Sequence, residues 1–234
     1  MRINKFISET GYCSRRVADT LISSGRVTIN GIVAELGSQV GAGDTVRVDG
    51  QQVGAHKEHV YIMLHKPVGI TSTSEAHIKG NMVDFVGHEE RIFPIGRLDK
   101  DSEGLILLTN DGDVVNPILR SEGKHEKEYI VTVDKPITPA FVKGMSEGVH
   151  ILGSMTLPCQ VIPQAERVFR MVLTEGRNRQ IRRMCQKFGY RVTKLKRIRI
   201  MNIKLGSLPV GQWRDLTKEE LGTLFESMQY KPRR

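Results

Sequence analysis

The sequence predicts a two-domain α+β protein, in which a small N-terminal module precedes a larger domain on a mainly antiparallel, mixed β-sheet. The chain has 234 residues, which suits two hydrophobic cores, because single cores rarely grow far beyond roughly 150–200 residues. Strand-like and helix-like segments do not alternate regularly, which argues against a doubly wound parallel sheet. Apolar residues make up 39% of the chain, and this content is enough for globular packing.

Residues 1–53 carry the signals of two short helices. Apolar residues in the segment 3–7 have helical spacing, and Gly11 is expected to end this first helix. Ser14 is expected to cap a second helix, and Gly25 to end it. The module therefore begins with a pair of helices.

Two dipeptides in the same module have the composition of tight hairpin turns. Asn30-Gly31 separates two β-branched runs, and Asp49-Gly50 separates two more strand-like runs. Both dipeptides favour the backbone conformation that two-residue hairpin loops require. The next segment, residues 54–58, is short, polar and without periodicity, and we interpret it as a linker to the second domain.

The second domain, residues 59–234, contains longer segments with the periodicity of strands and others with the periodicity of helices. It opens with a buried-looking strand, which a Lys-Pro-Val-Gly turn follows. The predicted strands cover residues 60–64, 105–109, 129–133, 169–173 and 198–203, and the predicted helices cover residues 114–120, 139–147, 178–188 and 218–230. This mixture predicts an α+β domain.

The composition favours a reducing compartment. Cys13, Cys159 and Cys185 are scattered and odd in number, which does not suggest a disulfide framework. The sequence has no apolar run of the roughly 20 residues that a membrane helix needs, and its start lacks the pattern of a secretory signal. The histidines show no metal-ligand spacing, so no metal site is expected. We expect a cytoplasmic protein without a membrane partner.

Positive charge is concentrated near the C-terminus. Residues 167–234 hold 18 basic and 5 acidic side chains, and the stretch 177–199 holds ten basic and no acidic ones. A charge run is often a solvated face, but the missing acidic residues leave a strong positive field. Phosphate contacts supply most non-specific affinity for nucleic acids. A membrane surface is the other polyanion, and no amphipathic helix with a bulky apolar face accompanies the charge.

The segment 96–105 is the most informative for chemistry. It reads Gly-Arg-Leu-Asp-Lys-Asp-Ser-Glu-Gly-Leu and then enters an apolar strand. On its own it fits a solvated turn in which Asp99 is a cap. It also resembles the signature of pseudouridine synthases. In that family the aspartate after Arg-Leu is the catalytic residue, which corresponds to Asp99, whereas Asp101 and Glu103 have no counterpart and are expected to act locally.

Three further motifs follow the order of the same family. Lys66-Pro67-Val68-Gly69 resembles the opening motif of its catalytic domain, and Lys127-Glu128-Tyr129 resembles the segment that supplies an active-site tyrosine, Tyr129. The segment 175–184, Glu-Gly-Arg-Asn-Arg-Gln-Ile-Arg-Arg-Met, resembles the late motif. The resemblance implies that Arg182 pairs with Asp99 and that Ile181 packs against the base.

The N-terminal module resembles the S4 RNA-binding domain, on the segments Cys13-Ser14-Arg15-Arg16 and 25–31. Two arginines at a helix start oppose the helix dipole, which suggests an anionic partner. The chain is thus similar to the RsuA family of ribosomal RNA pseudouridine synthases. The segments 91–95 and 125–129 are most similar to the type that modifies large-subunit (23S) ribosomal RNA, and the small-subunit type is the alternative.

The resemblance implies a set of roles for single residues. Asp99 is the nucleophile toward the sugar, Tyr129 stacks on the uracil and removes a sugar proton, and Arg182 holds the carboxylate. Because the target must leave its stack, Arg97 is expected to fill the vacated space or to hold a phosphate. The remaining expected RNA contacts are Lys66 and Arg179 in the catalytic domain and Arg15, Arg16 and Arg26 in the S4-like module.

Rival interpretations come from two other classes. A ribosome assembly factor could keep the fold without the chemistry, but Asp99, Tyr129 and Arg182 together argue against this. A zinc deaminase needs a Cys-x-x-Cys pair, and a methyltransferase needs a glycine-rich cofactor loop, and the sequence has neither. We therefore expect an RNA pseudouridine synthase that acts as a monomer, without a cofactor, metal or obligate protein partner.

Overall fold

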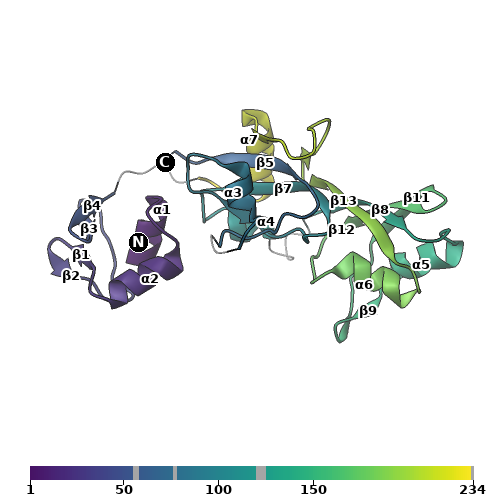
Figure 1. Cartoon of the computed structure of the whole chain (residues 1–234), viewed down its shortest axis with the longest axis horizontal. Helices are drawn as coiled ribbons and strands as arrows, with labels where there is room; N and C mark the ends of the chain where they lie inside the picture. Colours follow the sequence, from purple (N-terminus) through teal and green to yellow (C-terminus); the bar gives the residue numbers. More distant parts are fainter. Residues whose placement is uncertain (55–57, 76–77, 120–124, 233–234) are drawn as a thin grey trace. The chain divides into compact units, whose positions relative to one another are not determined.

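The computed structural model describes residues 1–54, 58–75, 78–119 and 125–232, which form two compact units. The first unit consists of Met1–Val60 with the short segments Glu89–Arg91 and Asn110–Gly112. The second unit consists of the remaining described residues (Figure 1). Of the predicted linker at 54–58, residues 55–57 lie outside the described residues. Each unit is described by itself below.

The first unit contains a helix pair and a small antiparallel sheet with the strand order β2-β1-β3-β4. Its elements are α1 (Ile3–Glu9), α2 (Arg15–Ser23), β1 (Val27–Ile29), β2 (Ile32–Val33), β3 (Val46–Val48) and β4 (Gln51–Val53). Ile3, Ala18 and Val46 are fully buried between helices and sheet. The predicted helix pair and both hairpins are confirmed. Asn30 and Gly31 have φ values of 52° and 84°, which is the conformation of a type I′ turn.

The second unit is built on one sheet with the strand order β11-β12-β8-β13-β7-β5-β15, which β6 and β14 extend by pairing with β7 and β13. Its strands are β5 (Tyr61–Lys66), β6 (Phe93–Ile95), β7 (Glu103–Thr109), β8 (Lys127–Val133), β11 (Gln160–Ala165), β12 (Val168–Leu173), β13 (Val192–Ile200), β14 (Ile203–Lys204) and β15 (Trp213–Asp215). All described pairs of this sheet are antiparallel except β13 and β7, which run parallel. The predicted mixed, mainly antiparallel sheet is confirmed.

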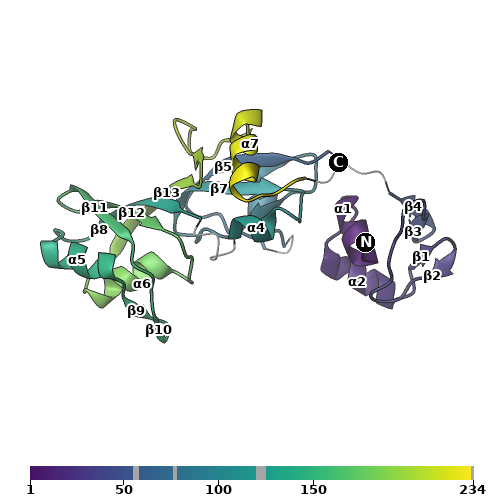
Figure 2. The same ribbon diagram turned by 180° about the vertical axis from the view of Figure 1, so that it is seen from behind.

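The helices of the second unit pack on its sheet in two groups, and each group forms a separate hydrophobic core with the strands beneath it (Figures 1 and 2). α5 (Pro139–Glu147) and α6 (Gln180–Lys187) pack on β8, β11, β12 and β13, and α4 (Val115–Leu119) and α7 (Lys218–Ser227) pack on β5 and β7. α3 (Met82–Val86) and the hairpin of β9 (His150–Ile151) and β10 (Ser154–Met155) complete the described elements. None of the helices within the described ranges is long and apolar enough to cross a membrane.

Several strands differ from the sequence-based expectation. The short strands β6, β9, β10 and β15 were not predicted, and two longer strands have clear physical reasons for the difference. β13 begins at Val192 instead of residue 198, because its first half exposes Thr193 and Lys194 on a solvated face and therefore lacks an apolar run. β11 was not predicted. It is an edge strand that contains Pro163, and the register shifts directly after it, as is typical of proline in sheets.

The parallel junction between β7 and β13 depends on Gly104. Gly104 lies opposite Arg197 with φ of +119°. A Cβ at this position would lie only 2.2 Å from the Arg197 carbonyl oxygen and 2.6 Å from its amide nitrogen. Both contacts are with backbone, which cannot rotate away. Only glycine allows the two strands to approach this closely.

We expect Gly104→Ala to lower the free energy of unfolding by about 2 kcal/mol or more, because overpacking and a strained φ angle each cost about 1–3 kcal/mol. Urea denaturation followed by circular dichroism measures this change. Gly222→Ala is the matched control, because Gly222 lies exposed in α7 and an added Cβ would meet nothing within 4 Å. Alanine should stabilise the helix there by up to about 1 kcal/mol. Equal stability of the two variants would contradict the close approach.

Candidate active site

A cavity of about 520 Å³ opens in the second unit between the loop before β7, the sheet and the start of α6. Its volume is in the range of ligand sites. Residues that the sequence predicted for the site and that line this cavity are Arg97, Asp99, Tyr129, Arg179 and Ile181. The structure thus brings together side chains from segments about 80 residues apart. Across the described ranges, no group of three or more His, Cys, Asp or Glu residues could hold a metal ion.

The loop that carries Asp99 is held by its main chain. Each of the five successive carbonyl oxygens from residue 97 to residue 101 accepts a hydrogen bond. The donors, in order, are the guanidinium of Arg197 (3.4 Å), the hydroxyl of Ser72 (2.6 Å), and the amides of Ser102 (3.0 Å) and Gly69 (2.7 Å), followed by the guanidinium of Arg182 (2.9 Å). The Asp99 carboxylate itself remains about one-third exposed toward the cavity. The loop is therefore fixed without using the side chain of Asp99.

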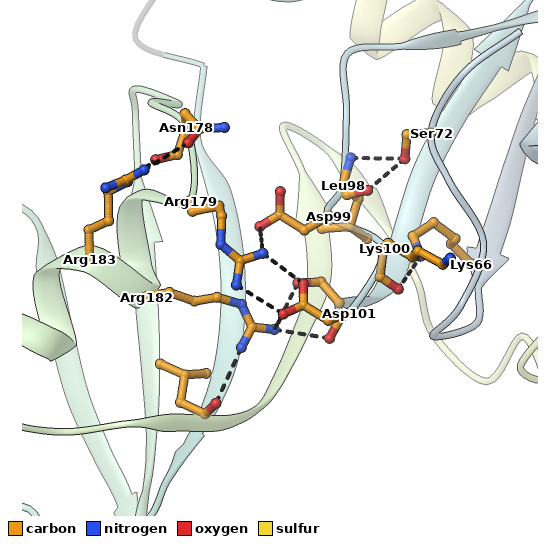
Figure 3. Close-up of polar contacts among 12 residues, drawn as sticks. Lys66, Ser72, Leu98, Asp99, Lys100, Asp101, Asn178, Arg179, Arg182 and Arg183 are labelled. Carbon is orange, nitrogen blue, oxygen red and sulfur yellow. Dashed lines mark hydrogen bonds and ion pairs between the residues drawn. The ribbon is translucent and has the colours of Figure 1, made fainter. Parts of the chain in front are cut away.

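Lys66 is one of the anchors of this loop rather than an RNA contact, which corrects the sequence-based expectation. Its side chain is fully buried, and Nζ donates to the carbonyl oxygens of Pro67 (2.8 Å) and Ile70 (2.9 Å). A third bond runs to the carbonyl oxygen of Lys100 (3.5 Å) (Figure 3). Burial lowers the pKa of Lys66 to about 8, and Asp101 and Asp99 oppose this shift. The opening motif therefore serves the architecture of the site.

Among the described residues, Arg179 is the arginine that forms an ion pair with Asp99. Its Nη1 lies 3.7 Å from Oδ2 of Asp99, and its two terminal nitrogens each donate to Asp101 at 3.0 Å (Figure 3). The hydrogen bond from Arg179, together with the charges of Arg182 and Arg179, lowers the pKa of Asp101 although its partial burial opposes this. Arg179 has a left-handed backbone with φ of 49° at the start of α6, which turns its side chain toward the two carboxylates.

Arg182 does not pair with Asp99 in the structure, contrary to the expectation. It donates to the carbonyl oxygen of Asp101, to the hydroxyl of Ser102 at 3.2 Å and to the carbonyl oxygen of Val192 at 3.2 Å, and its ion pair is with Asp101 at 3.4 Å (Figure 3). Residues three apart lie on the same side of a helix, so the sequence could not tell which of two arginines faces Asp99. Asp101, expected to act only locally, bridges both arginines.

Residues of the sheet and of α6 also line the cavity. Tyr129 on β8 and Ile181 on α6 are more than nine-tenths buried and line the cavity. Lys127 also lines it, which the sequence-based reasoning missed. Burial and the charge of Arg197 lower the pKa of Lys127. The signal was present, because residues two apart on a strand share a face, so Lys127 had to accompany Tyr129.

The basic residues expected to contact RNA in the first unit differ in their surroundings. Arg15 and Arg16 are exposed in the first turn of α2, which the Ser14 hydroxyl caps by accepting from the Val17 amide at 3.2 Å. Arg26 instead forms a two-point ion pair with Asp49, whose pKa this interaction lowers. The charge of Arg26 is therefore largely compensated, which weakens its expected role.

The cavity thus combines a carboxylate on a fixed loop with the ring of Tyr129 and the basic side chains of Lys127 and Arg179. A family model described as RNA pseudouridylate synthase matches residues 60–187, and an S4 domain model matches residues 1–46. The chain therefore belongs to the RNA pseudouridine synthases, in the RsuA family that carries an N-terminal S4 domain.

The similarity to known relatives covers nearly the whole chain. The dual-specificity RNA pseudouridine synthase RluF of Salmonella typhi is 59% identical over 227 residues, covering 96% of this chain and 78% of the relative. The ribosomal large subunit pseudouridine synthase B of Bacillus subtilis is 37% identical over 234 residues, covering 95% of each. A solved structure described as a pseudouridylate synthase has a TM-score of 0.71 at 29% identity, covering 96% of this chain and 99% of the other.

We expect Arg182→Ala to lower the free energy of unfolding by about 1–3 kcal/mol, because it removes the hydrogen bonds to the carbonyl oxygens of Asp101 and Val192 and to the Ser102 hydroxyl. Turnover should fall as well, because the loop of Asp99 loses an anchor. Arg183→Ala is the matched control, since within the described residues the Arg183 guanidinium bonds to Asn178, just before its own helix. It should change stability by less than about 0.5 kcal/mol. Equal losses from the two changes, measured by urea denaturation and pseudouridine formation, would refute the anchoring role.

Proposed function

We propose that this protein isomerises a specific uridine of large-subunit (23S) ribosomal RNA to pseudouridine, with Asp99 as the nucleophile. The observation that carries the proposal is the loop around Asp99, in which all five carbonyl oxygens from residue 97 to residue 101 are bonded and the carboxylate faces the cavity. A nucleophile fixed in this way is oriented before the substrate arrives, which lowers the entropic cost of reaching the transition state.

The proposed chemistry needs only the residues of the chain. An oxygen of the Asp99 carboxylate attacks C1′ of the ribose, while the bond between C1′ and N1 of uracil breaks. The detached uracil then rotates and its C5 forms a bond with C1′ as the bond from Asp99 breaks. The hydrogen on C5 leaves as a proton and N1 takes up a proton, so the overall change is an isomerisation. One difficult step is thereby divided into easier ones. No electrons are exchanged with a carrier, so no cofactor is required.

Neighbouring side chains have supporting roles in this proposal. Tyr129 and Ile181 hold the uracil between an aromatic and an aliphatic surface, and Arg179 supplies positive charge 3.7 Å from the Asp99 carboxylate. The target nucleotide must leave its stack to enter the cavity. Arg97 is exposed at the cavity wall, where it can fill the vacated space or hold a phosphate.

We further propose that the two domains divide the work. Residues 1–53 dock the RNA as an S4 domain, through the exposed Arg15 and Arg16, and residues 59–234 perform the catalysis. The protein acts as a monomer in the cytoplasm. The large-subunit substrate is supported by the name of the relative from Bacillus subtilis, and the names of the RluF relatives mention a dual specificity for RNA.

The substrate is tested by mapping pseudouridines in total RNA from cells that lack the protein and from cells in which it is restored. A site in 23S ribosomal RNA that disappears and returns supports the proposal. A site that changes only in small-subunit or transfer RNA would replace the proposed substrate.

We expect Asp99→Asn to abolish catalysis without unfolding the protein. The amide keeps the size of the side chain but removes its charge and nucleophilicity, so turnover should fall by at least about a thousandfold. The free energy of unfolding should change by less than about 1 kcal/mol, because the described hydrogen bonds that hold this loop go to its main-chain carbonyl oxygens and not to the Asp99 carboxylate. Tritium release from C5 of labelled uridine reports turnover, and filter binding reports affinity for RNA.

Asp215→Asn is the matched control, because Asp215 is an exposed aspartate on β15 outside the cavity. Asp101→Asn is not a suitable control, because Asp101 binds both Arg179 and Arg182. Substantial tritium release by folded Asp99→Asn protein would overturn the mechanism. If the wild-type protein releases no tritium from any ribosomal RNA, the proposed function itself fails.

We expect the double change Arg15→Gln and Arg16→Gln to weaken RNA binding and to reduce its dependence on salt. Each phosphate contact contributes about 0.7–0.9 to the slope of log K against log salt concentration, so the slope should decrease by about 1.5. Arg26→Gln is the comparison, because Asp49 already compensates that charge, and it should leave the slope nearly unchanged. An equal decrease in both variants would show that Arg26 contacts phosphate as well.

A further inference from the structure

Arg197 is a buried arginine in the wall of the cavity that faces Asp99. It is only 4% exposed and lies on β13 directly opposite Tyr129 of β8. Both residues line the cavity. Cross-strand partners place their side chains on the same face of a sheet, so the guanidinium of Arg197 lies beside the ring that is proposed to hold the uracil.

The guanidinium of Arg197 has two bonded nitrogens and one without a partner. Nε donates to the carbonyl oxygen of Leu105 at 2.7 Å, and Nη1 donates to the carbonyl oxygen of Arg97 at 3.4 Å. Nη2 is buried and has no hydrogen-bond partner in the described part of the chain. A buried charged donor without an acceptor is unfavourable, and an acceptor that enters the cavity would relieve this.

The cavity wall around Arg197 holds more positive than available negative charge. Lys127 is a second, partly buried cation in the same wall, and burial together with the charge of Arg197 lowers its pKa. Of the carboxylates in the wall, Glu175 is engaged by Arg177 and by Gln180, at 3.0 Å and 2.7 Å. Asp99 is the reacting group. The arrangement is therefore suited to a ligand that becomes negatively charged during the reaction.

We propose that Nη2 of Arg197 donates a hydrogen bond to a carbonyl oxygen of the target uracil and stabilises the negative charge of the base when it detaches. This inference rests on the proposed function. As the bond between Asp99 and C1′ forms and the bond between C1′ and N1 breaks, the electron pair of the broken bond stays on uracil. The charge spreads over N1 and the carbonyl oxygens, and Arg197, with Lys127 nearby, neutralises it without proton transfer.

Arg197 fits this role better than the arginines of α6. Arg179 lines the cavity, but Asp101 engages its guanidinium. Arg182 pairs with Asp101 and does not line the cavity, whereas Arg197 lines it and its Nη2 is left for an acceptor. A guanidinium is always charged and needs no reorganisation when charge develops. Its bond to the Arg97 carbonyl oxygen also fixes the donor relative to Asp99, two residues further along the loop.

The test compares two target bases in single-turnover reactions of the full-length protein. One RNA carries uridine at the target position, and the other carries 5-fluorouridine. The anion of 5-fluorouracil is less basic than that of uracil, so it is a better leaving group. Arg197→Gln should slow consumption of uridine by about a hundredfold, the usual effect of removing one such donor. It should slow consumption of 5-fluorouridine at least about tenfold less, because the fluorinated anion needs less stabilisation. Chromatography of nucleosides after nuclease digestion measures both.

A purely structural role of Arg197 would slow both reactions equally, and this result would overturn the inference. Arg199→Gln is the matched control, because Arg199 lies on the same strand but pairs with Glu128 and Glu126. Any decrease in rate that it causes should be the same for the uridine RNA and the 5-fluorouridine RNA. If Arg197→Gln does not fold, Arg197→Lys provides the same comparison with one charge retained. A wild-type protein that is inactive on the uridine RNA would instead refute the proposed function.

Discussion

The close approach of two backbones at Gly104 is the constraint on which the site depends. There β7 and β13 run parallel, and the Arg197 backbone occupies the space of a missing Cβ. The loop of Asp99 leads directly into β7, while Arg197 extends from β13 to bond Arg97 in that loop. One steric requirement therefore sets the distance between the carboxylate and the basic wall of the cavity. The two hydrophobic cores hold the sheet on either side of this junction.

The loop that carries Asp99 is held by hydrogen bonds to its main-chain carbonyl oxygens, and this arrangement has a chemical consequence. Donors from Lys66, Ser72, Arg182 and Arg197 reach the loop from distant parts of the second unit. The side chain of Asp99 is therefore not needed to hold the loop and is available to react. Lys66 and Arg182, two basic residues of the motifs, thus bond to the main chain of this loop, although the charge of Lys66 suggested contact with RNA. A buried lysine with a pKa of about 8 illustrates this use of a cation.

The sequence motifs located the site but not its internal pairing. Asp99, Tyr129 and Ile181 line one cavity, as the resemblance implied. Arg182 and Lys66 were assigned to other partners, because motif positions give residue types and order, whereas both residues donate to carbonyl oxygens of the distant loop around Asp99. Arg197 was not singled out at all. It lies within a run of basic residues, and only its burial and its free nitrogen distinguish it from its neighbours.

Local sequence by itself determined the turns, the helix caps and the alternation that makes an antiparallel α+β domain. Asn30-Gly31 and the Ser14 cap act within a few residues, so their physics can be read from adjacent positions. Tertiary structure alone decided which arginine faces Asp99, which cations are buried, and that β13 meets β7 in parallel. These outcomes depend on contacts between residues up to about a hundred positions apart. Their energies arise from desolvation and from the geometry of the assembled fold, which no local pattern encodes.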